Sequence, residues 1–161
     1  MDKLHITHGT YPFLKKMKEQ NEQESMLLLL KDTGAVLLHE TGGNTLFKGG
    51  YSYDIFASKG ELSAGKFAVL AHFPVRDEGR PLFEDEVSQK ADAVMKEDAL
   101  LAVRGLRPLK GDTYIVVTVW KTEGAYTTWS AQDPDFPLAK EDKSVLKSPV
   151  YSSEYVIPKS N

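Results

Sequence analysis

The sequence contains no cysteine among its 161 residues. Disulfides, thiolate-bound zinc, iron–sulfur clusters and cysteine nucleophiles are therefore excluded. It also lacks an apolar run of the about 18 residues that a membrane span needs, since the longest one, residues 26–30, ends at Lys31. We expect no membrane span. Because strand-like alternation begins within the first residues, without a long apolar signal segment, we expect a cytoplasmic protein.

Charge of one sign is not in excess either. The net charge is −3, with lysine and glutamate interspersed, so no basic stripe is present that could neutralise phosphates. We therefore expect no nucleic-acid partner. What the chain does contain is an apolar fraction of 41%, which is enough for an ordinary globular core in one large or two small domains. A small ligand or another protein remains as the expected partner.

Residues 1–63 have the pattern of a small mixed α/β extension. Period-two alternation predicts strands, Thr10 is placed to cap a helix, and the turn at residues 31–34 joins two apolar runs as in a β-hairpin. The predicted elements are, in order, a strand at 4–8, a helix at 11–17, strands at 25–30, 35–39 and 45–48, and a helix at 51–58. This part is too short to bury a large core alone and should lean on its neighbour.

Residues 64–161 show a clearer pattern. The predicted elements are, in order, a strand at 67–73, a helix from Pro81 to Val94, a strand ending at Leu106, a strand at 113–120, a helix capped by Thr122, and a strand at 150–157. Acidic residues 84–86 are interpreted as charges that favour the start of the first of these helices. The order β-α-β-β-α-β is the ferredoxin-like split-βαβ motif, in which two helices cover one face of a four-stranded sheet.

The other face of that sheet also needs cover. In residues 114–120 both the odd-numbered and the even-numbered positions are largely apolar. Because these two sets face opposite sides of a strand, the pattern indicates burial on both faces. The simplest cover is a second copy of the chain. We therefore expect an α+β protein whose ferredoxin-like domain forms a dimeric α/β barrel, with the N-terminal extension beside it, and we expect a homodimer.

Three segments carry a resemblance to a known family. They are GRPLFE at 79–84, LRPLKGDTY at 106–114 and VWKTEGAYTTW at 119–129. Together they resemble the antibiotic-biosynthesis-monooxygenase superfamily, in particular its haem-degrading monooxygenases. The version of that family with an N-terminal extension is similar over nearly the whole chain, including residues 6–10 and 39–43.

The resemblance implies a site between the sheet and the helices, lined in the family by an asparagine, a tryptophan and an iron-ligating histidine. The tryptophan falls on Trp129 and the asparagine position on Ala71, while the histidine falls on Ala139 or Lys140. No histidine follows His72, so His72 is the candidate for a relocated haem-iron ligand. Strand alternation nevertheless points His72 to the sheet face opposite Ala71.

The same resemblance implies haem as substrate and cofactor, no other metal, and an external electron donor. Trp129 would press on the porphyrin, and Lys140 and Arg107 would bind its propionates. The structural alternatives are a core anchor for Trp129, an interface histidine for His72, and solvated side chains for Lys140 and Arg107. The remaining histidines are in the N-terminal part and would reach iron only if that part folds over the cleft.

The expected function is therefore a haem-degrading monooxygenase that opens the porphyrin ring and releases iron. Two alternatives remain open. One is a non-catalytic protein of the TRAP signalling type, which shares the two-part layout and lacks the catalytic residues. The other is a cofactor-free monooxygenase that acts on a small quinone-like molecule.

Overall fold

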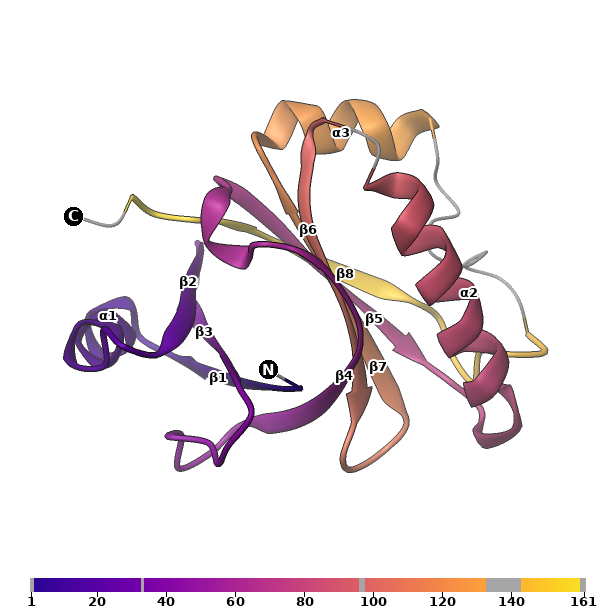
Figure 1. The fold of residues 1–161 in the computed structure, drawn as a ribbon, viewed down its shortest axis with the longest axis horizontal. Helices are drawn as coiled ribbons and strands as arrows, with labels where there is room; N and C mark the ends of the chain where they lie inside the picture. Colours follow the sequence, from indigo (N-terminus) through magenta and orange to yellow (C-terminus); the bar gives the residue numbers. More distant parts are fainter. Residues whose placement is uncertain (1, 33, 96–97, 133–142, 160–161) are drawn as a thin grey trace.

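The computed structural model describes residues 2–32, 34–95, 98–132 and 143–159, and its strands close into one antiparallel barrel with helices outside it (Figure 1). In chain order the elements are β1 (Lys3–Gly9), α1 (Tyr11–Gln20), β2 (Ser25–Lys31), β3 (Gly34–Thr41), β4 (Tyr51–Gly60), a 3₁₀ turn (Leu62–Ala64), β5 (Phe67–Pro74), a 3₁₀ turn (Asp77–Gly79), α2 (Arg80–Val94), β6 (Leu100–Pro108), β7 (Thr113–Trp120), α3 (Glu123–Gln132) and β8 (Tyr151–Val156).

The barrel consists of two sheets with the same internal order. Around the barrel the strands run β1-β3-β2-β8-β5-β7-β6-β4. The C-terminal sheet, β8-β5-β7-β6, is the predicted ferredoxin-like sheet, and the N-terminal sheet, β4-β1-β3-β2, repeats its order with one helix instead of two. The fold class is thus the expected α+β, and the N-terminal part is a second half-barrel rather than an appendage.

This arrangement changes the reason for expecting a dimer. The apolar inner face of the C-terminal sheet packs against the chain's own N-terminal sheet, through aliphatic side chains such as Leu4, Leu38 and Val117, which belong to one buried cluster. One chain therefore closes the barrel that the sequence pattern assigned to two copies. Burial of both faces of β7 is explained without a partner, and the homodimer stays a prediction.

Helices cover the outer faces of the two sheets. Figure 1 shows α2 and α3 on one side of the barrel and α1 on the opposite side. Beneath α2 and α3 lies a second buried cluster that includes Phe83 and Trp120, and beneath α1 a third that includes Leu14 and Leu37. As predicted, Thr10 caps α1, since its Oγ1 accepts a hydrogen bond from the Phe13 amide at 3.4 Å. No helix in the described ranges combines the length and hydropathy needed to cross a bilayer.

Two predicted elements of the N-terminal part are wrong. Residues 51–58 form strand β4 rather than a helix, and residues 45–48 form no strand. The physical reason for the first error is a β-bulge between Ile55 and Ala57. Ile55 points into the barrel and Phe56 packs outside it, as neighbours in a strand do, and the extra residue at the bulge interrupts the period-two alternation by which a strand is predicted.

Candidate functional site

Trp129 lies on α3, against the outer face of the C-terminal sheet. The helix starts where the sequence predicts, because the Thr122 Oγ1 accepts a hydrogen bond from the Ala125 amide at 3.1 Å. Trp129 is partly buried and packs on the cluster beneath α2 and α3. We call this outer face, with α2 and α3 above it, the helix side.

The indole of Trp129 is supported from below by a second tryptophan. The ring centroids of Trp129 and Trp120 lie 5.1 Å apart at 45°. Trp120 is fully buried at the end of β7, where its Nε1 donates to the Thr118 Oγ1 at 2.9 Å. Tyr126, one turn before Trp129 on α3, meets Trp120 edge-on at 5.4 Å. Trp120 was not a predicted site residue, although its place at the end of the most apolar strand indicates a buried position.

Ala71 and His72 are neighbours on β5 and lie on opposite faces of the C-terminal sheet. Ala71 packs on the helix side, in the same cluster as Trp129. His72 lines a cavity at one end of the barrel interior. This is the division that strand alternation predicts. The asparagine position of the family therefore shares a face with Trp129, whereas His72 would hold iron only in the barrel and not against Trp129.

The environment of His72 favours an uncharged imidazole. Its ring stacks on Tyr151 at 4.4 Å with 7° between the planes. Burial lowers its pKa below the usual value, because the charged imidazolium loses hydration inside the barrel end.

The other three histidines also lie away from Trp129. His8 lines the same barrel cavity as His72. His5 and His39 pair across β1 and β3, and each is buried. The His5 ring shares a hydrogen bond with the Ser52 Oγ at 2.8 Å, and the His39 Nε2 lies 2.8 Å from the Glu24 Oε1. Since the sequence has four histidines and all are described, none of them lines the helix side near Trp129.

Arg107 is held by a carboxylate of the protein itself. From β6 its Nε donates to the Glu84 Oε2 at 2.8 Å and its Nη2 to the Glu84 Oε1 at 2.5 Å, while the Tyr114 hydroxyl donates to the same Glu84. The hydrogen bond from Arg107 is the main cause of a lowered Glu84 pKa. A propionate would have to share or displace Glu84, so the role of Arg107 in binding haem stays a prediction.

Glu84 was interpreted as a charge near the start of its helix, but α2 begins at Arg80 and has no acidic residue in its first turn. Glu84 instead links α2 to Arg107 on β6 and to Tyr114 on β7. Because Arg107 lies 23 positions from Glu84 in the sequence, no local sequence pattern predicts this ion pair.

Lys140, the other predicted propionate ligand, and Ala139 lie outside the described residues. In the described ranges no group of three or more histidine, aspartate or glutamate side chains is placed to hold a metal ion. The predicted site is thus represented by Trp129 and Ala71 on the helix side, with Arg107 in its own ion pair and His72 in the barrel.

The chain is similar to known proteins in sequence and in fold. Residues 66–135 match the sequence model of the family described as antibiotic biosynthesis monooxygenase. The signal transduction protein TRAP of Staphylococcus aureus is 27% identical over 133 residues, which cover 83% of this chain and 80% of that protein.

Solved structures share the fold along the whole chain. A major regulator of staphylococcal pathogenesis superposes with a TM-score of 0.85 at 24% identity, covering 98% of this chain and 99% of the other. A haem-degrading enzyme from Listeria monocytogenes superposes with a TM-score of 0.78 at 20% identity, covering 97% and 99%. Residues 66–135 are therefore similar to the antibiotic biosynthesis monooxygenase model, and the chain shares its fold with these solved structures.

Proposed function

We propose that the protein binds haem on the helix side and opens its porphyrin ring, using electrons from an external donor. The observation that supports this most directly is the support of Trp129 by Trp120, at 5.1 Å between ring centroids. A flat side chain can bend a planar macrocycle only if it cannot itself move aside, and a buried tryptophan behind it restricts that movement. The solved haem-degrading enzyme of the same fold makes haem the natural first ligand to test.

The residues on the helix side fit this substrate in part. They include the tryptophan, but the four histidines of the chain lie in the barrel end or in the N-terminal sheet. Haem iron in proteins is held by histidine, cysteine, methionine or tyrosine, and the sequence has no cysteine. The ligand must therefore differ from that of the family pattern. His72, the predicted relocated ligand, lines the barrel cavity, and Lys140, the predicted propionate ligand at the position of the family histidine, lies outside the described residues.

The test is a titration of haem into the purified protein, followed by addition of a reductant. Saturable binding with a shifted Soret band and its subsequent decay is the expected result. Trp129→Ala should slow the decay more than it weakens haem binding, because the tryptophan acts on the bound ring. Phe13→Ala is the matched control, since Phe13 is an exposed aromatic residue on α1.

A second candidate function is a non-catalytic signalling or interaction role of the TRAP type. It is favoured by Ala71 at the asparagine position and by the absence of a histidine near Trp129, together with 27% identity to the TRAP protein. If haem shows no saturable binding, this candidate replaces the first. If haem binds without any decay after reduction, the enzymatic part of the proposal is wrong.

A further inference from the structure

The end of the barrel that contains His72 is hollow. A cavity of about 750 Å³ opens there, between β1, β4, β5, β7, β8 and the β6–β7 turn. We call it the barrel mouth. Its floor is apolar, made by Ile6, Leu70 and Ile115. Its size lies within the range of about 300–1,000 Å³ that is typical of small-molecule sites.

Aromatic and apolar side chains gather at the opening of the barrel mouth. Tyr51, Leu109 and Tyr151 all line the cavity, and each is at least half exposed. Large apolar side chains on a protein surface are usually scattered, so their grouping around one opening indicates a binding surface. Tyr151 is already stacked on His72, which presents a flat aromatic wall to the cavity.

The inner wall offers hydrogen bonds without charge. Tyr53 and Tyr155 line the cavity and are almost fully buried. Burial raises the pKa of Tyr53 to about 12, so its hydroxyl stays protonated at neutral pH. Together with the uncharged His72, these groups suit a ligand whose inner part is a ring and not an ion.

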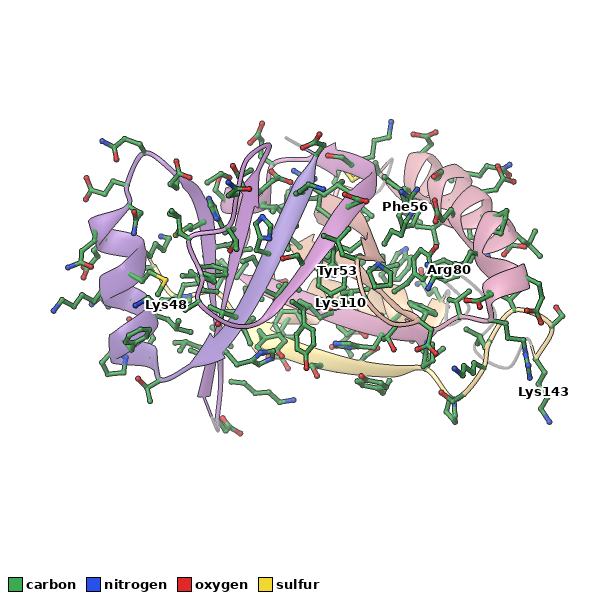
Figure 2. The ribbon with its side chains drawn as sticks, turned by 90° about the horizontal axis from the view of Figure 1, so that it is seen from below. Lys48, Tyr53, Phe56, Arg80, Lys110 and Lys143 are labelled. Atoms are coloured by element: carbon green, nitrogen blue, oxygen red, sulfur yellow. The ribbon has the colours of Figure 1, made fainter. Side chains whose placement is uncertain are left out.

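The opening carries positive charge. Lys110, in the β6–β7 turn, lines the cavity and is exposed. Lys31, at the end of β2, does not line the cavity but lies beside it, with its Nζ 5.8 Å from the ring centroid of Tyr155, which does line it. The carboxylate that lines the same opening, Asp112, is paired with the Lys147 Nζ at 2.5 Å. Figure 2 shows Tyr53 and Lys110 together near the centre of the view, between α1 and α2.

We propose that the barrel mouth is a binding site for a small aromatic carboxylate, with its ring system against the tyrosines and its carboxylate at Lys110 and Lys31. This site lies on the inner face of the C-terminal sheet, whereas the proposed haem site lies on the outer face. The inference therefore goes beyond the proposed function and does not depend on it.

The test is calorimetric titration with 2-naphthoate and with 2-naphthamide, its uncharged analogue of the same shape. We expect one 2-naphthoate per chain, and binding of the amide that is weaker by about fivefold, which is what a solvent-exposed ion pair can supply. The double variant Lys31→Gln/Lys110→Gln should bind both probes equally. Lys16→Gln/Lys48→Gln is its control, since both lysines are exposed and neither lines the cavity (Lys48 is labelled in Figure 2).

A filling variant tests the place of binding. Ser153 lines the cavity, and Ser152, its neighbour on β8, pairs with Ala71 and points to the other face. Ser153→Trp should abolish binding of 2-naphthoate, while Ser152→Trp should retain it. The double lysine variant keeps the proposal testable if Ser153→Trp does not fold.

Any one of several results would overturn this inference. They are the absence of saturable 2-naphthoate binding to the natural protein, equal binding of acid and amide, or binding that persists in folded Ser153→Trp. Displacement of 2-naphthoate by haem would also overturn it as a separate site. If 2-naphthoate binds as expected and haem does not bind, the inference stands and the proposed function falls.

Discussion

Arg104 on β6 donates its Nε hydrogen to the Glu40 Oε2 on β3 at 2.5 Å, in the interior of the barrel. The guanidinium also donates to the carbonyl oxygens of Lys59 and Gly60 at 2.8 and 2.9 Å. β3 and β6 are not neighbours, because β1 and β4 lie between them. The pair therefore connects the N-terminal sheet to the C-terminal sheet across the barrel.

Removing one partner of this pair should destabilise the whole barrel. Arg104→Met leaves the Glu40 charge buried and the carbonyl groups of Lys59, Gly60 and Val103 without this donor, so we expect a loss of about 3–5 kcal/mol in the free energy of unfolding at pH 7. Arg104→Met/Glu40→Leu should recover much of that loss, since no charge is then left unpaired. Urea unfolding followed by circular dichroism measures both.

The control for this prediction is an exposed ion pair. Lys59 and Asp92 interact at 2.7 Å with both side chains largely in solvent, and Asp92→Asn should cost less than about 1 kcal/mol. If Arg104→Met lowered the free energy of unfolding no more than Asp92→Asn does, the buried pair would not hold the two sheets together.

The Glu84 carboxylate should make stability depend on acid pH. Its pKa in the folded state is lowered, first by the hydrogen bond from Arg107, below a usual value of 4.5. The ionised form therefore stabilises the fold above about pH 4.5, and this contribution is lost as the pH falls through the lowered folded value.

Glu84→Gln should lower the free energy of unfolding by about 1–3 kcal/mol at pH 7. Its free energy of unfolding should also fall less steeply than that of the natural protein as the pH is lowered. The measurement is urea unfolding at several pH values between neutral and acid. Glu86→Gln, two residues along the same helix, is the control. Parallel pH curves for Glu84→Gln and the natural protein would contradict the prediction.

The part of the fold that the sequence predicts well is the C-terminal sheet with its helices. Period-two alternation located β5 and β7, and the hydroxyl groups of Thr10 and Thr122 marked the starts of α1 and α3. These are local signals, because each depends on residues within one strand or one helical turn. The same alternation correctly separated Ala71 from His72 across the sheet.

The features that the sequence did not predict depend on distant parts of the chain. Closure of the barrel by the N-terminal sheet requires β4 to pair with β6, and the bulge in β4 hides its alternation. The Glu40–Arg104 and Glu84–Arg107 pairs join residues 64 and 23 positions apart. Nothing in the spacing of such residues indicates that they meet.

His72 should make stability fall as the pH drops below neutral. Burial lowers its pKa in the folded state below the usual 6.5, so the unfolded chain takes up a proton first as the pH falls. Stability that is present above pH 6.5 is therefore lost progressively below it.

The variant His72→Phe keeps the stacking on Tyr151 and removes the titrating group. Its free energy of unfolding should change less than that of the natural protein between about pH 7 and pH 5. Ser153→Ala, at a residue that lines the same cavity and does not titrate, should keep the natural pH dependence. Equal slopes for His72→Phe and the natural protein would refute the burial argument.

Trp120 should control the mobility of Trp129. Trp120→Phe removes the larger ring that contacts Trp129 and leaves the Thr118 hydroxyl without its donor, so we expect a loss of about 1–3 kcal/mol. Because the sequence has two tryptophans, Trp129 is the sole indole in this variant. Its fluorescence anisotropy should decay partly on the nanosecond timescale of side-chain motion.

Trp129→Phe supplies the comparison, since the remaining Trp120 is fully buried and should show only the tumbling of the whole protein. If haem is degraded as proposed, Trp120→Phe should slow ring opening although Trp129 is still present, because an indole that moves cannot hold the porphyrin bent. A rigid Trp129 in Trp120→Phe, or an unchanged rate of Soret decay, would show that Trp120 stabilises the core without positioning Trp129.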